Sequence, residues 1–67
     1  MTFIIGTDSD GSFDRIMTYI VSKSLTHMKT QRGGTTEFEV HGLQENYNYF
    51  DTEIKAGRIR AYLEYVV

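Results

Sequence analysis

The spacing of apolar residues changes twice along this chain, and this change limits which folds the chain can form. Residues 2–6 are a short apolar run with several β-branched side chains, which is typical of a buried strand. From Ser12 onward the apolar residues recur every three or four positions, which predicts one amphipathic helix over residues 12–31. Gly33 and Gly34 are interpreted as the left-handed end of that helix, and beyond them the period becomes two.

The alternating part of the sequence divides into three predicted strands. Polar and apolar residues alternate over 35–41, the segment 47–54 is aromatic and alternating, and residues 58–67 form the last strand. Gly57 is expected in a hairpin turn that requires a positive φ. The sequence therefore predicts an α+β fold in the order β-α-β-β-β. One amphipathic helix packs on one face of a mixed sheet of three to four strands, and the other face is open. The first and last strands are the most apolar, so they are expected side by side near the middle of the sheet.

The small size of the chain excludes several classes of protein. With 67 residues it is interpreted as one small domain over residues 1–67, without a linker or an internal repeat. It has no cysteine, which excludes disulfides, thiolate metal sites and a cysteine nucleophile. No apolar run approaches the ~20 residues that cross a bilayer, and the N-terminus lacks the layout of a signal peptide, so a cytoplasmic location is expected. The net charge of −2 argues against a dedicated nucleic-acid binder.

Charged residues are grouped into blocks along the sequence. Residues 15–34 contain four bases and no acid, whereas residues 35–53 contain five acids and no base. Such blocks pair with one another across neighbouring elements in many monomeric sheets. The alternative is an acidic patch, which includes Glu37 and Glu39 and which meets a basic surface on a partner.

Tyrosines gather in the second half of the chain. If a strand over 47–54 turns Phe50 toward the core, Tyr47 and Tyr49 point outward, and Tyr62 on the last strand lies beside them. Tyrosine suits an interface because its rigid ring buries a large area while its hydroxyl remains available to a partner, although tyrosines also pair across strands within a monomer. The predicted partner-binding residues are Tyr47, Tyr49, Tyr62, Glu37 and Glu39.

These features favour a non-enzymatic protein-binding domain that needs no cofactor. In size and style the chain is similar to inhibitors encoded by phages or mobile elements, such as anti-CRISPR and host-takeover proteins. This resemblance implies an inhibitor that acts in the cytoplasm of a host cell. The sequence ends in an apolar strand, which is either covered or paired with another chain, so a homodimer through a sheet edge is a further expectation.

Residues 8–12, with the sequence DSDGS, are the most motif-like stretch. They follow an apolar strand and resemble the first motif of haloacid-dehalogenase-type phosphatases, which implies a nucleophile at Asp8 and an acid/base at Asp10. Gly6 and Thr7 separate the apolar residues 3–5 from Asp8, and the chain is too short for the other motifs of that family. Together with Asp14, the same aspartates are a weak candidate site for Mg²⁺ or Ca²⁺. The structural alternative is a polar loop that caps the helix.

A second class of function rests on the basic residues. Lys23 and Lys29 fall on the predicted helix and Arg32 directly follows it, and bases near tyrosines can bind single-stranded nucleic acid by charge and stacking. The alternative function is therefore a nucleic-acid-binding module that uses the basic face of the helix. His27 and His41 have neither the spacing of a metal site nor the context of a Ser-His-Asp arrangement, so no catalytic residue is predicted.

Overall fold

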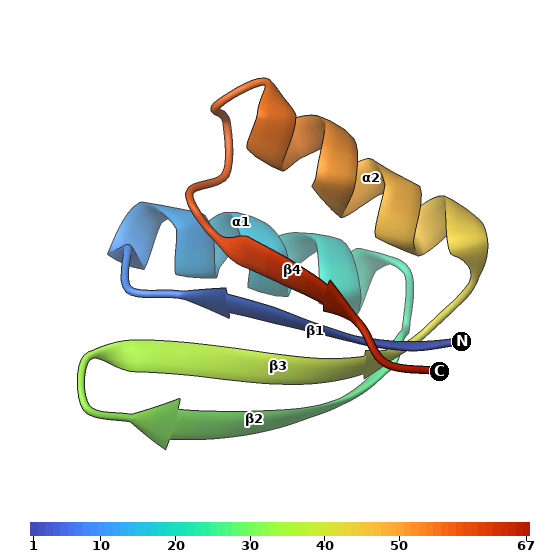
Figure 1. Ribbon diagram of the computed structural model, residues 1–67, viewed down its shortest axis with the longest axis horizontal. Coiled ribbons are helices and arrows are strands. Elements are labelled where there is room, and N and C mark those ends of the chain that lie inside the picture. The colour runs from blue at the N-terminus through green and yellow to red at the C-terminus, as the bar shows by residue number, and fades with distance from the viewer.

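The computed structural model describes all 67 residues and contains two helices and one four-stranded sheet (Figure 1). The elements are β1 (Thr2–Thr7), α1 (Asp10–Ser22), β2 (Thr26–Arg32), β3 (Thr35–His41), α2 (Gln44–Lys55) and β4 (Tyr62–Tyr65). The strands lie in the order β2-β3-β1-β4, and every neighbouring pair is antiparallel. The element order is that of the split β-α-β, or ferredoxin-like, motif.

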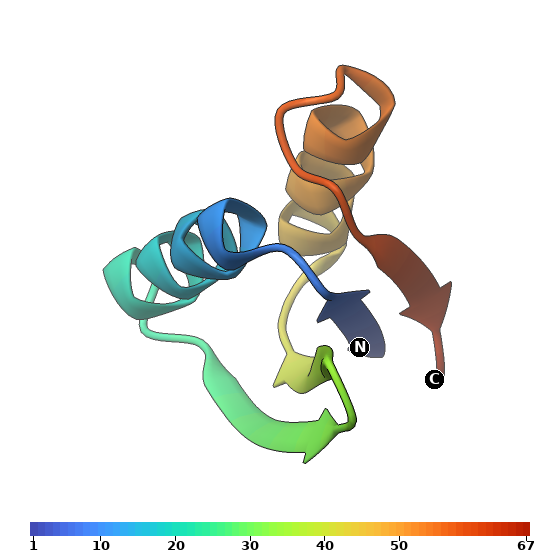
Figure 2. The same ribbon diagram turned by 90° about the vertical axis from the view of Figure 1, so that its left-hand side faces the viewer.

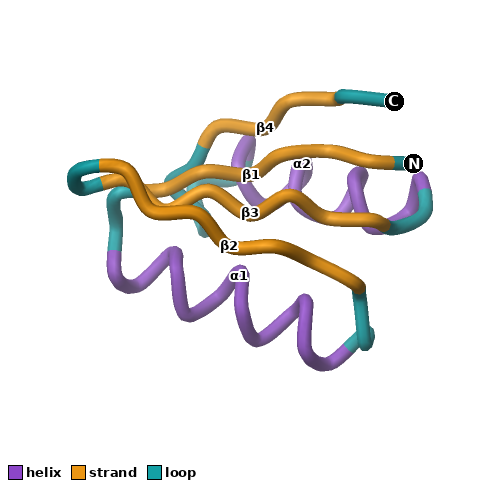
Figure 3. Tube along the Cα trace, turned by 90° about the horizontal axis from the view of Figure 1, so that it is seen from below, coloured by secondary structure: helices purple, strands orange, loops and turns teal.

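Both helices lie on the same side of the sheet, α1 toward β2 and α2 toward β4 (Figure 2). Aromatic contacts agree with this arrangement. The ring of Phe13 on α1 lies 5.5 Å from that of Phe38 on β3, and the ring of Tyr47 on α2 lies 5.6 Å from that of Phe3 on β1. Figure 3 shows the four strands side by side, with β2 and β4 at the two edges. No helix covers the opposite face of the sheet.

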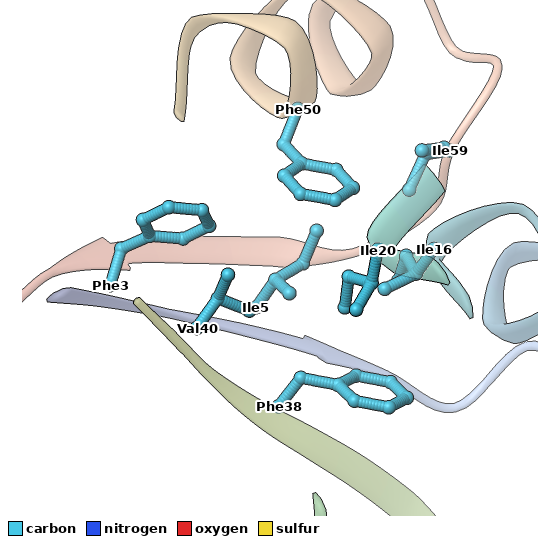
Figure 4. Close-up of a cluster of buried hydrophobic side chains, with 8 residues drawn as sticks. All are labelled: Phe3, Ile5, Ile16, Ile20, Phe38, Val40, Phe50 and Ile59. Atoms are coloured by element: carbon cyan, nitrogen blue, oxygen red, sulfur yellow. The ribbon is translucent and has the colours of Figure 1, made fainter. Parts of the chain in front are cut away.

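The core lies between the sheet and the helices. Side chains alternate between the two faces of a strand, so every second residue of β1 and β3 points toward the helices. Helix α1 contributes two residues that are four positions apart. Eight fully buried side chains form this cluster (Figure 4): Phe3, Ile5, Ile16, Ile20, Phe38, Val40, Phe50 and Ile59. Burying each of the larger ones contributes about 1.5–3 kcal/mol relative to leaving it in water. The central strands β1 and β3 therefore provide most of the contact between the sheet and the core.

The predicted helix over 12–31 is wrong in its second half. α1 ends at Ser22, Ser24 takes a positive φ of 55°, and residues 26–32 form β2. Gly33 and Gly34 are not the end of the helix but the two-residue turn of the β2–β3 hairpin, with φ 57° at Gly33. A positive φ at the first central residue is typical of a type II′ turn, which matches the twist of the two strands.

The predicted strand over 47–54 is also wrong, because these residues lie in α2. Tyr47, Phe50 and Ile54 are three and four positions apart, so the helical period places them on one side, where they contact the core. The Asn46 side chain accepts a hydrogen bond from the Leu43 backbone N–H at 2.8 Å, which caps the start of α2. Gly57 has the predicted positive φ, 78°, but it follows the end of this helix rather than forming a hairpin turn.

Other predictions are confirmed or corrected in detail. The strand over 35–41 is confirmed at its bounds, the first strand extends to Thr7, and the last strand is shorter, at 62–65. The α+β class, the pairing of the first strand with the last and the open sheet face are confirmed, but β4 is an edge strand and does not lie near the middle of the sheet. The sheet is antiparallel throughout rather than mixed, and two helices cover it rather than one. No helix combines the length and the hydropathy needed to span a membrane.

Candidate protein-binding surface

The sheet face away from the helices, here called the open face, carries the alternate residues that the core does not use. Cross-strand registers join these residues into rows that run across the sheet. The residues of the open face are Thr2, Ile4 and Gly6 on β1; Thr26, Met28, Thr30 and Arg32 on β2; Thr35, Glu37, Glu39 and His41 on β3; and Tyr62 and Glu64 on β4.

One row is built around Gly6, which lies opposite Glu37 on one side and Tyr62 on the other. The Tyr62 ring lies directly over Gly6, and a Cβ atom at this position would overlap the ring. Glycine therefore lets the tyrosine cross β1, and the Tyr62 hydroxyl donates a hydrogen bond to the Glu37 carboxylate. This hydrogen bond, with burial and the Glu37 charge, raises the pKa of Tyr62 to about 12. The hydrogen bond and the close fit over Gly6 hold the ring in place, although the residue is 45% exposed.

The next row places acids on both sides of an apolar residue. Glu39 on β3 and Glu64 on β4 lie opposite Ile4 on its two sides, and Met28 on β2 lies opposite Glu39. The Met28 side chain is 64% exposed. The row therefore combines two carboxylates with apolar surface that water still reaches.

Basic groups lie only toward the margins of the open face. Arg32 is at the end of β2, and His41 is at the end of β3, where its Nε2 lies 3.4 Å from a Glu39 carboxylate oxygen and its Nδ1 lies 3.0 Å from Thr2 Oγ1. Three carboxylates, those of Glu37, Glu39 and Glu64, thus face one permanently charged base. The centre of the open face is acidic.

A groove of about 340 Å³ lies beside the Tyr62 ring at one end of the sheet. Its lining includes Asp8, Thr35 and Arg60. The groove gives the open face a recess of mixed charge next to the Tyr62 ring.

The structure brings together three of the five predicted partner-binding residues. Glu37, Glu39 and Tyr62 share the open face, as the alternation predicts. Tyr47 and Tyr49 do not lie beside them, because their segment is a helix in the other layer. Tyr47 contacts the core, and the Tyr49 ring stacks on that of Tyr19 at 3.8 Å, where burial raises the pKa of the Tyr49 hydroxyl.

Sequence reasoning missed Ile4, Met28 and Glu64 as residues of this surface. Glu64 could have been predicted from the sequence, because it is two positions from Tyr62 and residues two positions apart in a strand point to the same face. Ile4 could also have been predicted, since it lies between two buried residues of a strand. The position of Met28 could not be predicted, because the sequence pattern placed its segment in a helix.

The basic helix face predicted for nucleic-acid binding is not formed. Lys23 follows the end of α1, where its Nζ lies 5.9 Å from the centre of the Tyr19 ring. Lys29 and Arg32 are on β2 and point to opposite faces of the sheet, since they are three positions apart. Lys29 reaches toward the helices, with its Nζ 5.6 Å from the centre of the Phe13 ring. The three bases therefore do not share a surface.

The aspartate-rich stretch behaves as a capping loop. Ser9 is the N-cap residue, and its hydroxyl accepts a hydrogen bond from the Ser12 N–H at 3.3 Å. The Ser12 hydroxyl in turn accepts from the Arg60 N–H at 2.8 Å, and the Thr7 hydroxyl donates to the Arg60 carbonyl at 2.7 Å. The hydroxyls of this stretch thus anchor the segment that leads into β4.

The same stretch contains the weak candidate metal site. Asp8, Asp10 and Asp14 belong to no cluster, because the structure has no group of three or more His, Cys, Asp or Glu side chains that could hold a metal ion. The phosphatase-like roles implied for Asp8 and Asp10 have no further support in the arrangement around them.

Comparison of the chain with protein-family models gives no match, and no curated protein matches it. The candidate surface therefore depends on geometry and chemistry alone. Its rows offer hydrogen-bond acceptors, a fixed aromatic ring and exposed apolar surface, which are the components of a binding surface.

Proposed function

We propose that this protein is a non-catalytic protein-binding domain whose open face binds a basic surface on a partner protein. One observation carries the proposal: the sheet face without a covering helix combines three carboxylates with the apolar and aromatic side chains of Ile4, Met28 and Tyr62. Acidic groups around an apolar centre suit a partner surface of lysines and arginines around its own apolar patch.

The state of Tyr62 supports this proposal energetically. Fixing a mobile side chain at an interface costs about 0.5–1.5 kcal/mol. The hydrogen bond to Glu37 and the close fit over Gly6 already hold the ring, so little of this cost remains on binding. Tyrosine is also enriched among the residues that contribute most to interfaces.

The charge of the open face also restricts the partner. Two copies of the chain that meet through this face would bring Glu37, Glu39 and Glu64 close to the same residues of the other copy. Like charges that meet across an interface cost several kcal/mol. The favoured occupant is a basic protein and not a second copy.

Basic protein surfaces commonly bind nucleic acid or other acidic ligands. A small domain that covers such a surface with its own carboxylates competes with that ligand. We therefore extend the proposal to an inhibitor of the kind that phages and mobile elements encode, including anti-CRISPR and host-takeover proteins, which acts in the cytoplasm of a host cell.

The test begins with affinity capture of the tagged protein from a lysate of its native host, with and without nuclease, followed by mass spectrometry. The captured protein is then purified, and its affinity is measured by calorimetry at two salt concentrations. We expect a nuclease-resistant partner with a basic surface, and an affinity that falls as salt rises.

A matched pair of variants connects the binding to the open face. Glu39→Lys with Glu64→Lys reverses two charges there, whereas Asp14→Lys with Glu45→Lys reverses two exposed acids on the helices. We expect the first variant to lose at least about tenfold in affinity, since each close charge pair at an interface is worth roughly 1.5 kcal/mol or more. Equal affinity of both variants would overturn the proposal.

A further inference from the structure

The edge strand β2 has an unusual position in this fold. All seven of its residues pair with β3 in one continuous register, yet all seven side chains are exposed. No residue of β2 belongs to the core or to the partly buried side chains around it. The strand is therefore held mainly by backbone pairing and by the turn at Gly33 and Gly34. Side-chain contacts with the other elements include those of His27 with the Phe38 ring and of Lys29 with the Phe13 ring. The outer edge of β2 has no neighbour in the sheet.

The two edges of the sheet differ in length and regularity. β4 has four residues, whereas β2 has seven and contains neither a proline nor a break in its register with β3. A long regular edge presents unpaired backbone N–H and C=O groups in the spacing that an added strand requires. β2 is therefore the edge better suited to accept a further strand.

The charge on β2 indicates what such a strand carries. Lys29 and Arg32 point to opposite faces of the sheet, and neither takes part in an ion pair within the chain. The 15–36 segment around them contains no acid. An added strand thus meets one unpaired base on each face, at positions three residues apart.

We propose that the edge of β2 binds an extended acidic segment of a partner protein, which adds to the sheet as a fifth strand. The backbone hydrogen bonds supply the attachment, and two acids three positions apart pair with Lys29 and Arg32. This site is separate from the open face, because its ligand is acidic rather than basic, and it does not depend on the function proposed above.

A second copy of the chain is the less suitable occupant. If two β2 strands pair antiparallel about their centres, Lys29 of one copy lies opposite Lys29 of the other, and like charges directly opposite are destabilising. A lysine on the edge strand is one of the devices by which natural sheets prevent such self-pairing. The same lysine attracts a strand that carries glutamate or aspartate.

The test is an NMR titration of the isotopically labelled protein with a synthetic peptide. The peptide has seven residues of valine and threonine type except for two glutamates three positions apart, and a control peptide carries lysines at these two positions. We expect saturable shifts in the amides of residues 26–32 with the acidic peptide, slower hydrogen exchange there, and no saturable binding of the control peptide.

Two charge-reversed variants complete the test. Lys29→Glu with Arg32→Glu leaves the core untouched, and Arg15→Glu with Lys55→Glu makes the same change in net charge on the two helices. We expect the first to bind the acidic peptide about tenfold more weakly and the second to bind it nearly as the unaltered protein does. Circular dichroism verifies that both remain folded.

Three results would overturn the proposal. The first is equal binding of both peptides or of both variants, and the second is amide shifts on β4 or the open face instead of on β2. The third is protection of the β2 amides that grows with protein concentration in the absence of peptide, which would identify a second copy as the occupant.

Discussion

β1 and β2 flank the same strand, β3, on its two sides, and each pairs with it in a regular antiparallel register. Their side chains differ completely. Phe3 and Ile5 on β1 are fully buried, whereas every residue of β2 is exposed. Equal backbone pairing therefore accompanies very unequal burial. This contrast shows that backbone pairing is enough for a segment to form a strand, whereas the burial of its side chains decides how much the strand contributes to the stability of the fold.

In energetic terms the two strands belong to different classes. Burying a large apolar side chain contributes about 1.5–3 kcal/mol, whereas an exposed cross-strand pair contributes about 0.2–1 kcal/mol. Strands of the second class open locally at a lower free energy than the core does. β1 therefore contributes much more to the stability of the domain than β2, whose exposed side chains can change at little cost to the fold.

The largest expected effect tests the comparison directly. Phe3→Ala should lower the free energy of unfolding by about 3–5 kcal/mol, because it removes a fully buried ring from the core. Met28→Ala on β2 should lower it by less than about 0.5 kcal/mol. Urea denaturation followed by circular dichroism measures both. If Met28→Ala lowers the free energy of unfolding nearly as much as Phe3→Ala does, the conclusion that β2 lies outside the core is wrong.

A second prediction concerns the exposed side of β1. Gly6→Ala should lower the free energy of unfolding by about 1–3 kcal/mol, since the added Cβ displaces the Tyr62 ring. In a Tyr62→Ala background the same change should be neutral or stabilising by up to about 1 kcal/mol, because alanine restricts the unfolded chain more than glycine does. Urea denaturation of all four proteins gives the coupling energy, and a coupling near zero would contradict the close fit.

A third prediction separates the two strands by their local stability. Gly33→Ala should cost about 1 kcal/mol, because φ at this residue is 57° and alanine avoids that region. The cost should appear mainly in the β2–β3 hairpin. Hydrogen exchange followed by NMR should accelerate in the amides of 26–32 and remain nearly unchanged in those of β1. Uniform acceleration in both strands would mean that β2 does not open separately.

The smallest expected effect is a pH dependence at Tyr62. Its pKa is raised to about 12 in the folded protein, from an ordinary value of 10.0, with the Glu37 hydrogen bond as the largest cause. The folded state therefore favours the protonated hydroxyl, and this stabilisation is complete below pH 10 and is lost as the pH rises through about 12. Ultraviolet titration, with Tyr62→Phe as the subtraction control, measures the pKa. Glu37→Gln should move it down toward 10.0, and an unchanged value would exclude the hydrogen bond as the cause.

The elements that could be predicted from the sequence are those whose apolar pattern fits only one type of secondary structure. The segment 35–41 is recognisable because a strand with one buried face leaves an alternation in the sequence, and the segment 2–6 because a short apolar run with β-branched residues indicates a buried strand. β2 leaves no such pattern, because it buries nothing. α2 is hidden for another reason, since the aromatic residues Tyr47, Tyr49 and Phe50 satisfy both an alternating and a helical period, and the capping by Asn46 involves only a side-chain amide.

The same reasoning explains which part of the candidate surface was predicted. Glu37, Glu39 and Tyr62 follow from the alternation of strands that were correctly identified. Tyr47 and Tyr49 were placed on the sheet because a wrong period was assigned to their segment. The fit of Tyr62 over Gly6 depends on residues 56 positions apart, and only the register of β1 with β4 brings them together.

The pairing of β1 with β4 also governs the order in which the domain can assemble during synthesis. β1 leaves the ribosome before the other elements, yet both of its neighbours come later, β3 after α1 and β2, and β4 after everything else. Contacts between distant parts of a chain slow folding, because a long loop must close before they form. The central strand of this sheet therefore keeps one edge unpaired until the last strand has been made, and the complete sheet forms only after translation has passed residue Tyr65.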